Sequence, residues 1–139
     1  MTTISNKNIV RQYVENIENT GDVSKIHKYI AENYTEIYEG KHYPIGIQGA
    51  IDHVLGVRKV FPDLKIEIEN QIAEGDWVVT IYSVSGTFQE EWLDLKPTGK
   101  TIIFTGVNVD RIIDGKIIEH GGAVNLLDPL LKAGVLGKK

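Results

Sequence analysis

The amino-acid sequence predicts an α+β fold in which about three N-terminal helices pack on a strongly curved antiparallel sheet. Apolar residues recur at helical spacing up to Phe61, and they alternate with polar residues after Pro62. Pairs of turn-forming residues separate the alternating runs. Helices that precede a set of antiparallel strands indicate helices on one face of a sheet. With 139 residues, the chain is expected to form a single domain over residues 1–139.

The first helix is predicted over residues 4–19. Its apolar residues, such as Val10 and Val14, follow a helical period and form one face. Ser5 or Asn6 is the expected N-cap, because the side-chain oxygen of either residue can accept a hydrogen bond from a free amide of the first turn.

Two further helices are predicted before the sheet. Residues 23–34 read as a helix that Asp22 can cap, and residues 50–61 read as a helix that ends before Pro62. Proline disfavours helical geometry in the residue ahead of it. Residues 35–49 are expected to form a loop, because they contain three glycines and a proline.

Four long strands are predicted in the second half of the chain. The turn Glu74-Gly75-Asp76 and the dipeptide Asp114-Gly115 each indicate a hairpin, since glycine and aspartate tolerate positive φ. Long strands must twist and curl to keep one face covered, which produces a cone with an open mouth. The expected strands cover residues 64–72, 77–88, 101–113 and 117–127.

Composition excludes several classes of partner. The net charge is −4 and no basic stripe is present, so nucleic acid is not expected to bind. No run of about 18 apolar residues is present, so no membrane association is expected. The absence of cysteine fits a reducing compartment, and we predict a cytoplasmic location. The four histidines show no metal-binding spacing, and no metal site is predicted.

Two long stretches carry a resemblance to a known family. FPDLKIEIENQIAEGDWVV and KPTGKTIIFTGVNVDRIIDGKIIEH resemble the SnoaL-like polyketide cyclase family, a branch of the NTF2-like superfamily. The resemblance implies an NTF2-like cone with a deep apolar pocket, and a homodimer. It also implies ring closure by aldol chemistry without a metal or cofactor, in which a pocket carboxylate transfers a proton.

The chain departs from the family pattern after Glu119-His120. Gly121, Gly122 and Asn125 stand where the family usually has a tryptophan, the acid/base aspartate and a second aspartate. Glycine cannot transfer a proton. Gly122 is therefore expected to line the substrate site, either by enlarging the pocket or by bending the strand.

His120 is the predicted catalytic residue. In a strand, residues 118, 120, 122 and 124 share one face, which the resemblance places toward the pocket. A histidine can serve as acid or base where no carboxylate is present. The alternative is a buried neutral histidine that is held by a structural hydrogen bond.

Five further side chains are candidates for substrate binding. Tyr13 and Tyr38 can offer hydroxyl groups, and Asn108 is a polar residue in the middle of a strand that needs a partner. His53, on the third helix, can reach across the mouth. Trp92 lies in a connecting loop and can cap the pocket. For each residue, a packing or surface role is the alternative.

Two groups of charged residues complete the prediction. A carboxylate beside Trp92 (Glu90, Glu91 or Asp94) can replace the missing aspartate. Arg111 and Glu119 are expected on the opposite face of the sheet, with a structural role or one in dimer contacts.

Three functions follow. The first is a cofactor-independent cyclase, isomerase or hydrolase that acts by proton transfer on a small, largely apolar carbonyl or polyketide-type compound. The alternative is a non-catalytic binding protein for a small apolar ligand, because Gly122 replaces the family's acid/base aspartate. The third is an interaction protein that uses the outer face of the sheet.

Overall fold

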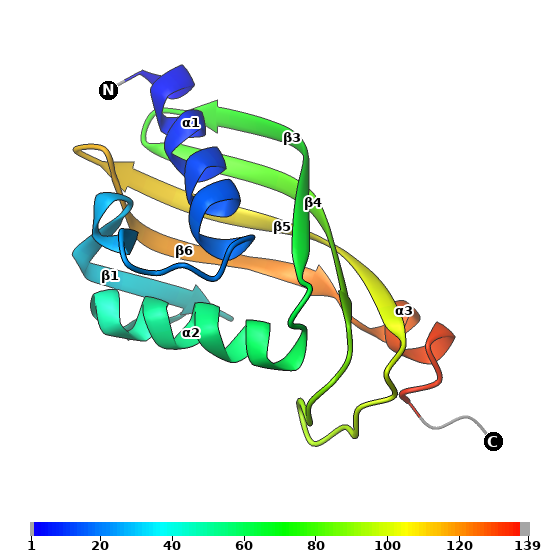
Figure 1. The fold of residues 1–139 in the computed structure, drawn as a ribbon. Helices are drawn as coiled ribbons and strands as arrows, with labels where there is room; N and C mark the ends of the chain where they lie inside the picture. Colours follow the sequence, from blue (N-terminus) through cyan, green and yellow to red (C-terminus); the bar gives the residue numbers. More distant parts are fainter. Residues whose placement is uncertain (1, 137–139) are drawn as a thin grey trace.

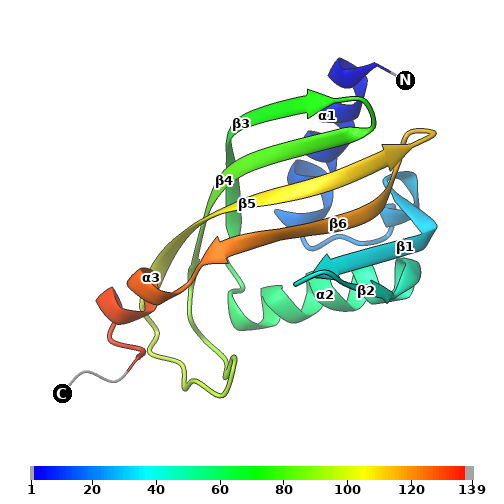
Figure 2. The same ribbon diagram turned by 180° about the vertical axis from the view of Figure 1, so that it is seen from behind.

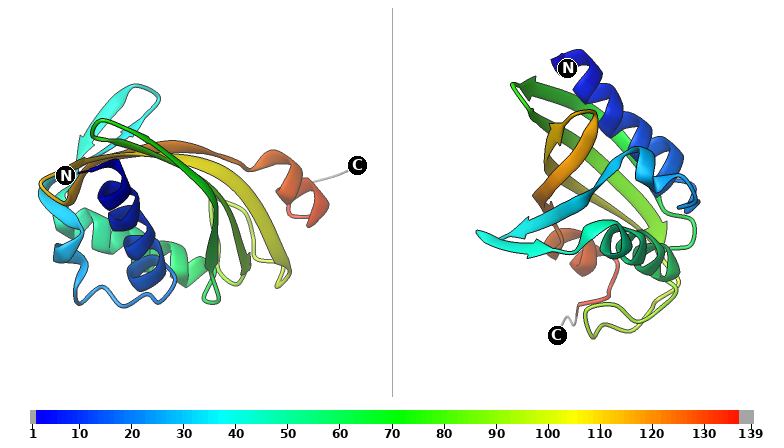
Figure 3. Two further views of the ribbon diagram at one scale, coloured as in Figure 1. Left: turned by 90° about the horizontal axis from the view of Figure 1, so that it is seen from above. Right: turned by 90° about the vertical axis from the view of Figure 1, so that its left-hand side faces the viewer.

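The computed structural model describes residues 2–136 as a curved six-stranded sheet with helices on its concave side (Figure 1). Seen from above, the strands arch around α1 and α2 (Figure 3). The elements are α1 (Thr3–Tyr13), a π-helical turn (Val14–Glu18), a 3₁₀ turn (Ile26–Lys28), β1 (Ile30–Tyr38), β2 (Lys41–Pro44), α2 (Gly46–Val60), β3 (Lys65–Glu74), β4 (Trp77–Thr87), β5 (Thr101–Ile113), β6 (Lys116–Asn125) and α3 (Leu127–Lys132).

The sheet is mixed rather than purely antiparallel as predicted. Its strand order is β2-β1-β6-β5-β4-β3, and β1 runs parallel to β6 while all other pairs are antiparallel. The reverse view shows the convex face, over which no helix of the described residues lies along the middle of the strands (Figure 2). Helix α1 packs on β3 and β4, and α2 packs on β1.

Helix α1 begins earlier than predicted. Thr2 is the N-cap, and it forms a capping box in which its side chain and the Ser5 side chain each accept the other residue's backbone N–H at 3.0 Å. The prediction of Ser5 or Asn6 as the N-cap was therefore wrong. Asn6 is buried instead, one turn inside the helix.

The helix predicted over residues 23–34 is not formed. A short 3₁₀ turn is followed by β1, which contributes Ile30 and Tyr34 to the core. The register of β1 against β6 shifts between Ile30 and Thr35, so two consecutive residues, Glu32 and Asn33, are exposed. This bulge interrupts the alternation that identifies a strand, and the apolar residues then fall at helix-like spacing.

The segment 35–49, which was predicted to be a loop, also forms mostly regular secondary structure. β1 continues to Tyr38 and pairs with β2 through a tight turn at Glu39-Gly40, where both residues have positive φ. Glutamate is not a typical residue of such a turn, which explains why the hairpin was missed. β2 is an edge strand, and Pro44 at its end costs no hydrogen bond within the sheet.

The second half of the chain follows the prediction closely. β3 to β6 form an antiparallel meander, and Asp114 and Gly115 have φ values of 51° and 77°. The helix predicted over residues 50–61 begins at Gly46. Three α-helices are present within residues 2–136, but they are not all N-terminal as predicted: α1 and α2 precede the long strands, and α3 follows them. No helix within residues 2–136 is long and apolar enough to cross a membrane.

Two hydrophobic clusters fill the space between the helices and the sheet. One joins α1, β1 and α2 through residues such as Val10, Ile30 and Val54. The other lies beyond the C-terminal end of α2 and is built around Phe61 and Phe88. Residues of both clusters line a single cavity on the concave side of the sheet, which makes this cavity the natural candidate for a functional site.

Candidate functional site

The cavity has a volume of about 260 Å³ and two kinds of wall. Apolar side chains, among them Val57, Phe61 and Phe104, form most of its lining. Trp92 joins them and packs edge-on against Phe61, with the ring centroids 5.4 Å apart. The polar side chains include Tyr13, Glu18, Tyr34, Glu36, Tyr38, His53, Asn108 and His120. Such a cavity suits a ligand with a hydrocarbon body and a few polar atoms.

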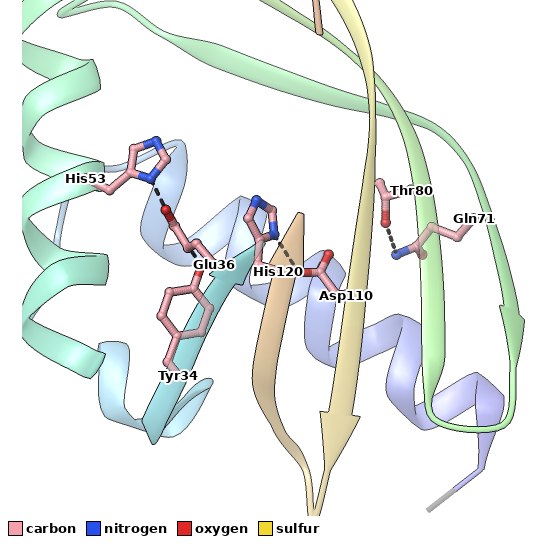
Figure 4. Close-up of polar contacts among 7 residues, drawn as sticks. All are labelled: Tyr34, Glu36, His53, Gln71, Thr80, Asp110 and His120. Carbon is pink, nitrogen blue, oxygen red and sulfur yellow. Dashed lines mark hydrogen bonds and ion pairs between the residues drawn. The ribbon is translucent and has the colours of Figure 1, made fainter. Parts of the chain in front are cut away.

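His120 on β6 forms a short ion pair with Asp110 on β5 (Figure 4). The imidazole Nδ1 lies 2.6 Å from Asp110 Oδ1, and Asp110 is only 3% exposed. The two residues face each other because of a register shift between Arg111 and Ile112. Without the bulge, the hairpin register would place Val109 opposite His120. The bulge therefore builds this pair.

The environment of His120 favours the charged imidazole. Burial lowers its pKa, but the charge of Asp110 and the hydrogen bond to it, together with the charges of Glu18 and Glu36, raise the pKa to about 9. His120 is therefore an imidazolium at neutral pH. Its Nδ1–H donates to Asp110, which leaves Nε2–H on the side of the ring away from Asp110 (Figure 4).

A second histidine–carboxylate pair lies beside the first (Figure 4). His53 Nδ1 on α2 is 3.0 Å from Glu36 Oε2 on β1, and the Tyr34 hydroxyl donates to the same oxygen at 3.0 Å. The hydrogen bond to Glu36 raises the pKa of His53. Burial raises the pKa of Glu36, but the hydrogen bond and charge of His53 and the Tyr34 hydroxyl outweigh it and lower that pKa.

Glu18 brings a third carboxylate into the cavity from the π-helical turn. Burial is the largest influence on it and raises its pKa to about 7, with opposing contributions from His120 and Asp110. A carboxyl group with this pKa can both release and accept a proton near neutral pH. Single π-helical turns occur frequently at functional sites.

Two tyrosines add neutral hydrogen-bond donors. Burial raises the pKa of Tyr13 and of Tyr38 above the ordinary tyrosine value, and Glu36 acts in the same direction on both. Both hydroxyls therefore stay protonated at neutral pH. A protonated hydroxyl in an apolar cavity can hold a ligand oxygen.

Gly121 and Gly122 allow β6 to lie close to its neighbours. A Cβ at residue 121 would lie 2.6 Å from the Ile37 carbonyl oxygen of β1. At residue 122 it would collide with the Val107 carbonyl oxygen, and the φ of +148° is one that glycine tolerates and other residues avoid. A carboxylate at position 122 is therefore incompatible with this backbone. The two glycines therefore allow β6 to lie close to β1 and β5, and they do not simply leave room for a ligand.

All seven residues singled out from the sequence line the cavity: Tyr13, Tyr38, His53, Trp92, Asn108, His120 and Gly122. None of the acidic residues near Trp92 does, because Glu90, Glu91 and Asp94 are exposed. The expectation that Ile118 shares the pocket face with His120 was wrong, since the bulge moves it out of the lining. Arg111 and Glu119 form an ion pair of 3.5 Å with each other.

The sequence prediction missed several polar residues of the site, four of which are carboxylates or are bonded to one. Glu36 and Tyr34 lie in the strand that was mistaken for helix and loop, and Glu18 depends on the π-helical turn. Asp110 could have been predicted, because it lies two residues after Asn108 in the same strand and its side chain therefore points to the same face of the sheet. Within residues 2–136, no three histidine, aspartate or glutamate side chains gather as they would around a metal ion.

Comparisons with known proteins agree with this architecture. No curated protein matches the sequence. A putative hydroxylase from Streptomyces galilaeus, AclR, is 27% identical, with 99% of this chain and 89% of that chain covered and a TM-score of 0.83. A putative polyketide cyclase from Acidithiobacillus ferrooxidans is 24% identical, with 93% and 94% covered and a TM-score of 0.83.

IdmH, a putative polyketide cyclase from Streptomyces antibioticus, is also 24% identical, with 94% of this chain and 99% of that chain covered and a TM-score of 0.78. The family model described as SnoaL-like polyketide cyclase matches residues 7–132, which is most of the chain. By this match and by its fold, the chain belongs to the SnoaL-like polyketide cyclase family.

Proposed function

We propose that the protein is a cofactor-independent enzyme that transfers protons on a small, largely apolar carbonyl compound. Cyclisation, isomerisation and hydrolysis all fit this description, and structural relatives include both a putative hydroxylase and putative cyclases. Family membership therefore does not select the reaction, and the proposal depends on the site itself.

One observation supports the proposal above the others: His120, paired with the buried carboxylate of Asp110, lines a cavity that also has a large apolar wall. The Nε2–H of a charged imidazole can donate to a carbonyl oxygen and stabilise the negative charge that develops there. Tyr13 and Asn108 line the same cavity and offer further donors for that oxygen. The apolar wall holds the hydrocarbon part of the substrate and keeps the local dielectric low.

Hydrogen–deuterium exchange on a ketone tests the proposal. We expect the wild-type protein in D₂O to accelerate exchange of the α-protons of 2-tetralone over buffer alone, as followed by NMR. His120→Gln should reduce the protein-dependent rate by roughly 100-fold, the lower range for a lost proton-transfer group. A rate with His120→Gln equal to that of the wild type would contradict the role of His120.

The backbone at Gly122 favours a second candidate function, a binding protein that holds a small apolar ligand without changing it. The position at which the family carries its acid/base aspartate cannot accommodate a side chain here. Native mass spectrometry of the purified protein tests this alternative. A bound small molecule that is released unaltered, together with no exchange of 2-tetralone, would favour binding over catalysis.

Three expectations from the sequence stay predictions. The protein is expected to act in the cytoplasm, to need no metal or cofactor, and to form a homodimer. The convex face of the sheet, over which no helix of residues 2–136 lies (Figure 2), is the surface that such a dimer would use. Ile103 and Val107 on β5 are exposed, and their strand parity is opposite to that of the cavity-lining Phe104 and Asn108. Sedimentation velocity at micromolar concentration would show whether the chain is a dimer.

A further inference from the structure

Glu18 is the least engaged carboxylate of the cavity. Glu36 already accepts hydrogen bonds from Tyr34 and His53, and Asp110 is bound to His120. No group within residues 2–136 donates a hydrogen bond to the Glu18 carboxylate, although this carboxylate lines the cavity. A half-buried carboxylate without a donor has free lone pairs with which to accept a proton from a ligand.

The backbone that carries Glu18 is firmly anchored. The Arg58 guanidinium donates to the carbonyl oxygens of Glu18 and Asn19, at 3.1 and 3.3 Å. The Asn19 side chain is paired with the backbone of Ile66 on β3 through two hydrogen bonds of 2.9 and 2.7 Å. The π-helical turn is thus fixed to both α2 and β3. A catalytic group benefits from such a rigid support, which holds its carboxylate over the cavity.

We propose that Glu18 is the catalytic base that removes a proton from the carbon next to the substrate carbonyl, while His120 serves the oxygen of that carbonyl. This inference rests on the proposed function and assigns its substrate class: a neutral ketone whose acidic C–H group is flanked by hydrocarbon. The two residues come from opposite layers of the fold, Glu18 from the helical layer and His120 from the sheet, so a ligand in the cavity lies between them.

The step balances without any further reactant. The C–H bond breaks and its proton moves to a Glu18 carboxylate oxygen. The electron pair forms a C=C bond, and the π electrons of the C=O bond move to oxygen, which takes a proton from His120 Nε2. The Glu18 carboxyl group exchanges this proton with water. The enol then takes a proton from Glu18 at the same carbon, or at a conjugated carbon, and His120 recovers its proton from the oxygen. The first outcome exchanges hydrogen and the second isomerises the substrate.

The surrounding charges give this step a defined pH range. A pKa of about 7 for Glu18 and of about 9 for His120 leave Glu18 ionised and His120 protonated between those two values. The rate should therefore rise through pH 7 and fall through pH 9. The titratable and charged groups around Glu18 are Tyr13 on α1, Tyr34, Glu36 and Tyr38 on β1, His53 and Arg58 on α2, Tyr82 on β4, Asp110 on β5 and His120 on β6.

Exchange of 2-tetralone in D₂O distinguishes Glu18 from its neighbours. We expect Glu18→Gln to lower the protein-dependent rate by roughly 100-fold or more. It should also remove the rise through pH 7, whereas a structural role would leave the shape of the pH profile unchanged. Glu18→Asp should keep that rise at a reduced rate. The control is Glu15→Gln, since Glu15 is exposed on the same π-helical turn and should leave the rate unchanged.

The outcomes separate the two proposals. If the wild-type protein does not accelerate exchange, the proposed function itself is contradicted. A second outcome overturns only this inference. In that outcome the wild-type protein accelerates exchange and His120→Gln abolishes the acceleration, but Glu18→Gln keeps both the rate and its rise through pH 7. Glu18 is then not the base. Circular dichroism of each variant at the assay temperature verifies that the protein is folded.

Discussion

Replacing Glu18 should stabilise the protein at alkaline pH, because the folded state disfavours the charged carboxylate. Burial raises the Glu18 pKa from 4.5 to about 7. Such a rise corresponds to an ionisation penalty of at most about 3 kcal/mol in the free energy of unfolding. The folded state holds its proton to higher pH than the unfolded chain does. The penalty is therefore absent below about pH 4.5 and complete above about pH 7.

Glu18→Gln keeps the size of the side chain and removes the charge. We expect a gain of up to about 3 kcal/mol at pH 8, or roughly 10 °C in Tm, and no comparable gain at pH 4.5. Thermal unfolding of both proteins at the two pH values measures the difference, and the comparison between pH values cancels any cost of the new amide. Glu15→Gln should change Tm little at either pH, since Glu15 is exposed.

A Tm difference between Glu18→Gln and the wild type that is the same at both pH values would refute this reasoning. So would a larger loss of stability at pH 8. Either result would mean that the Glu18 carboxylate is well solvated or well paired in the folded protein, and that its pKa is ordinary.

Three other substitutions, one of them with a matched control, test the structure around the site. In urea unfolding, Gly122→Ala should destabilise the protein by roughly 2 kcal/mol or more, because residue 122 has a positive φ and a Cβ there would collide with β5. The control Gly56→Ala should be neutral or stabilising, since a Cβ at this position on α2 meets open space. Trp92→Ala should cost roughly 3 kcal/mol in the same assay, through lost aromatic packing. Glu119→Gln should cost less than about 1 kcal/mol, since its ion pair with Arg111 is partly exposed.

The second half of the fold was predictable because its local signals agree with its tertiary structure. Alternating residues along β3 and the Asp114-Gly115 turn identify strands and a hairpin without reference to the rest of the chain. β1 was not predictable in this way. Its bulge breaks the alternation, and its parallel pairing with β6 depends on a contact between segments that are more than 80 residues apart in sequence.

Part of the candidate site was predictable because side-chain direction follows from strand parity. His120 and Asn108 were found on that basis. The pairing of His120 with Asp110 requires the one-residue shift in the hairpin register, which the sequence does not reveal. The direction of Glu18 likewise depends on the π-helical turn, where one extra residue in the hydrogen-bonded ring rotates the side chains that follow.

The site also has a cost in stability that is consistent with function. Within residues 2–136, no group donates a hydrogen bond to the Glu18 carboxylate, and burial makes its charge unfavourable at neutral pH. The positive charge of His120 lowers the pKa of Glu18 and partly offsets that cost, whereas the negative charge of Asp110 raises this pKa. Residues that reduce stability in this way are frequent at active sites, where a reactive side chain is needed.

The protonation state of His120 is the most direct measure of the account as a whole. In protein labelled with ¹⁵N-histidine, with the His120 signals assigned through their loss in His120→Gln, both ring nitrogens should stay protonated at pH 7.5 and titrate near pH 9. Asp110→Asn should move this transition clearly lower. A wild-type His120 that is neutral at pH 7.5, with its transition at or below pH 6.5, would contradict the account.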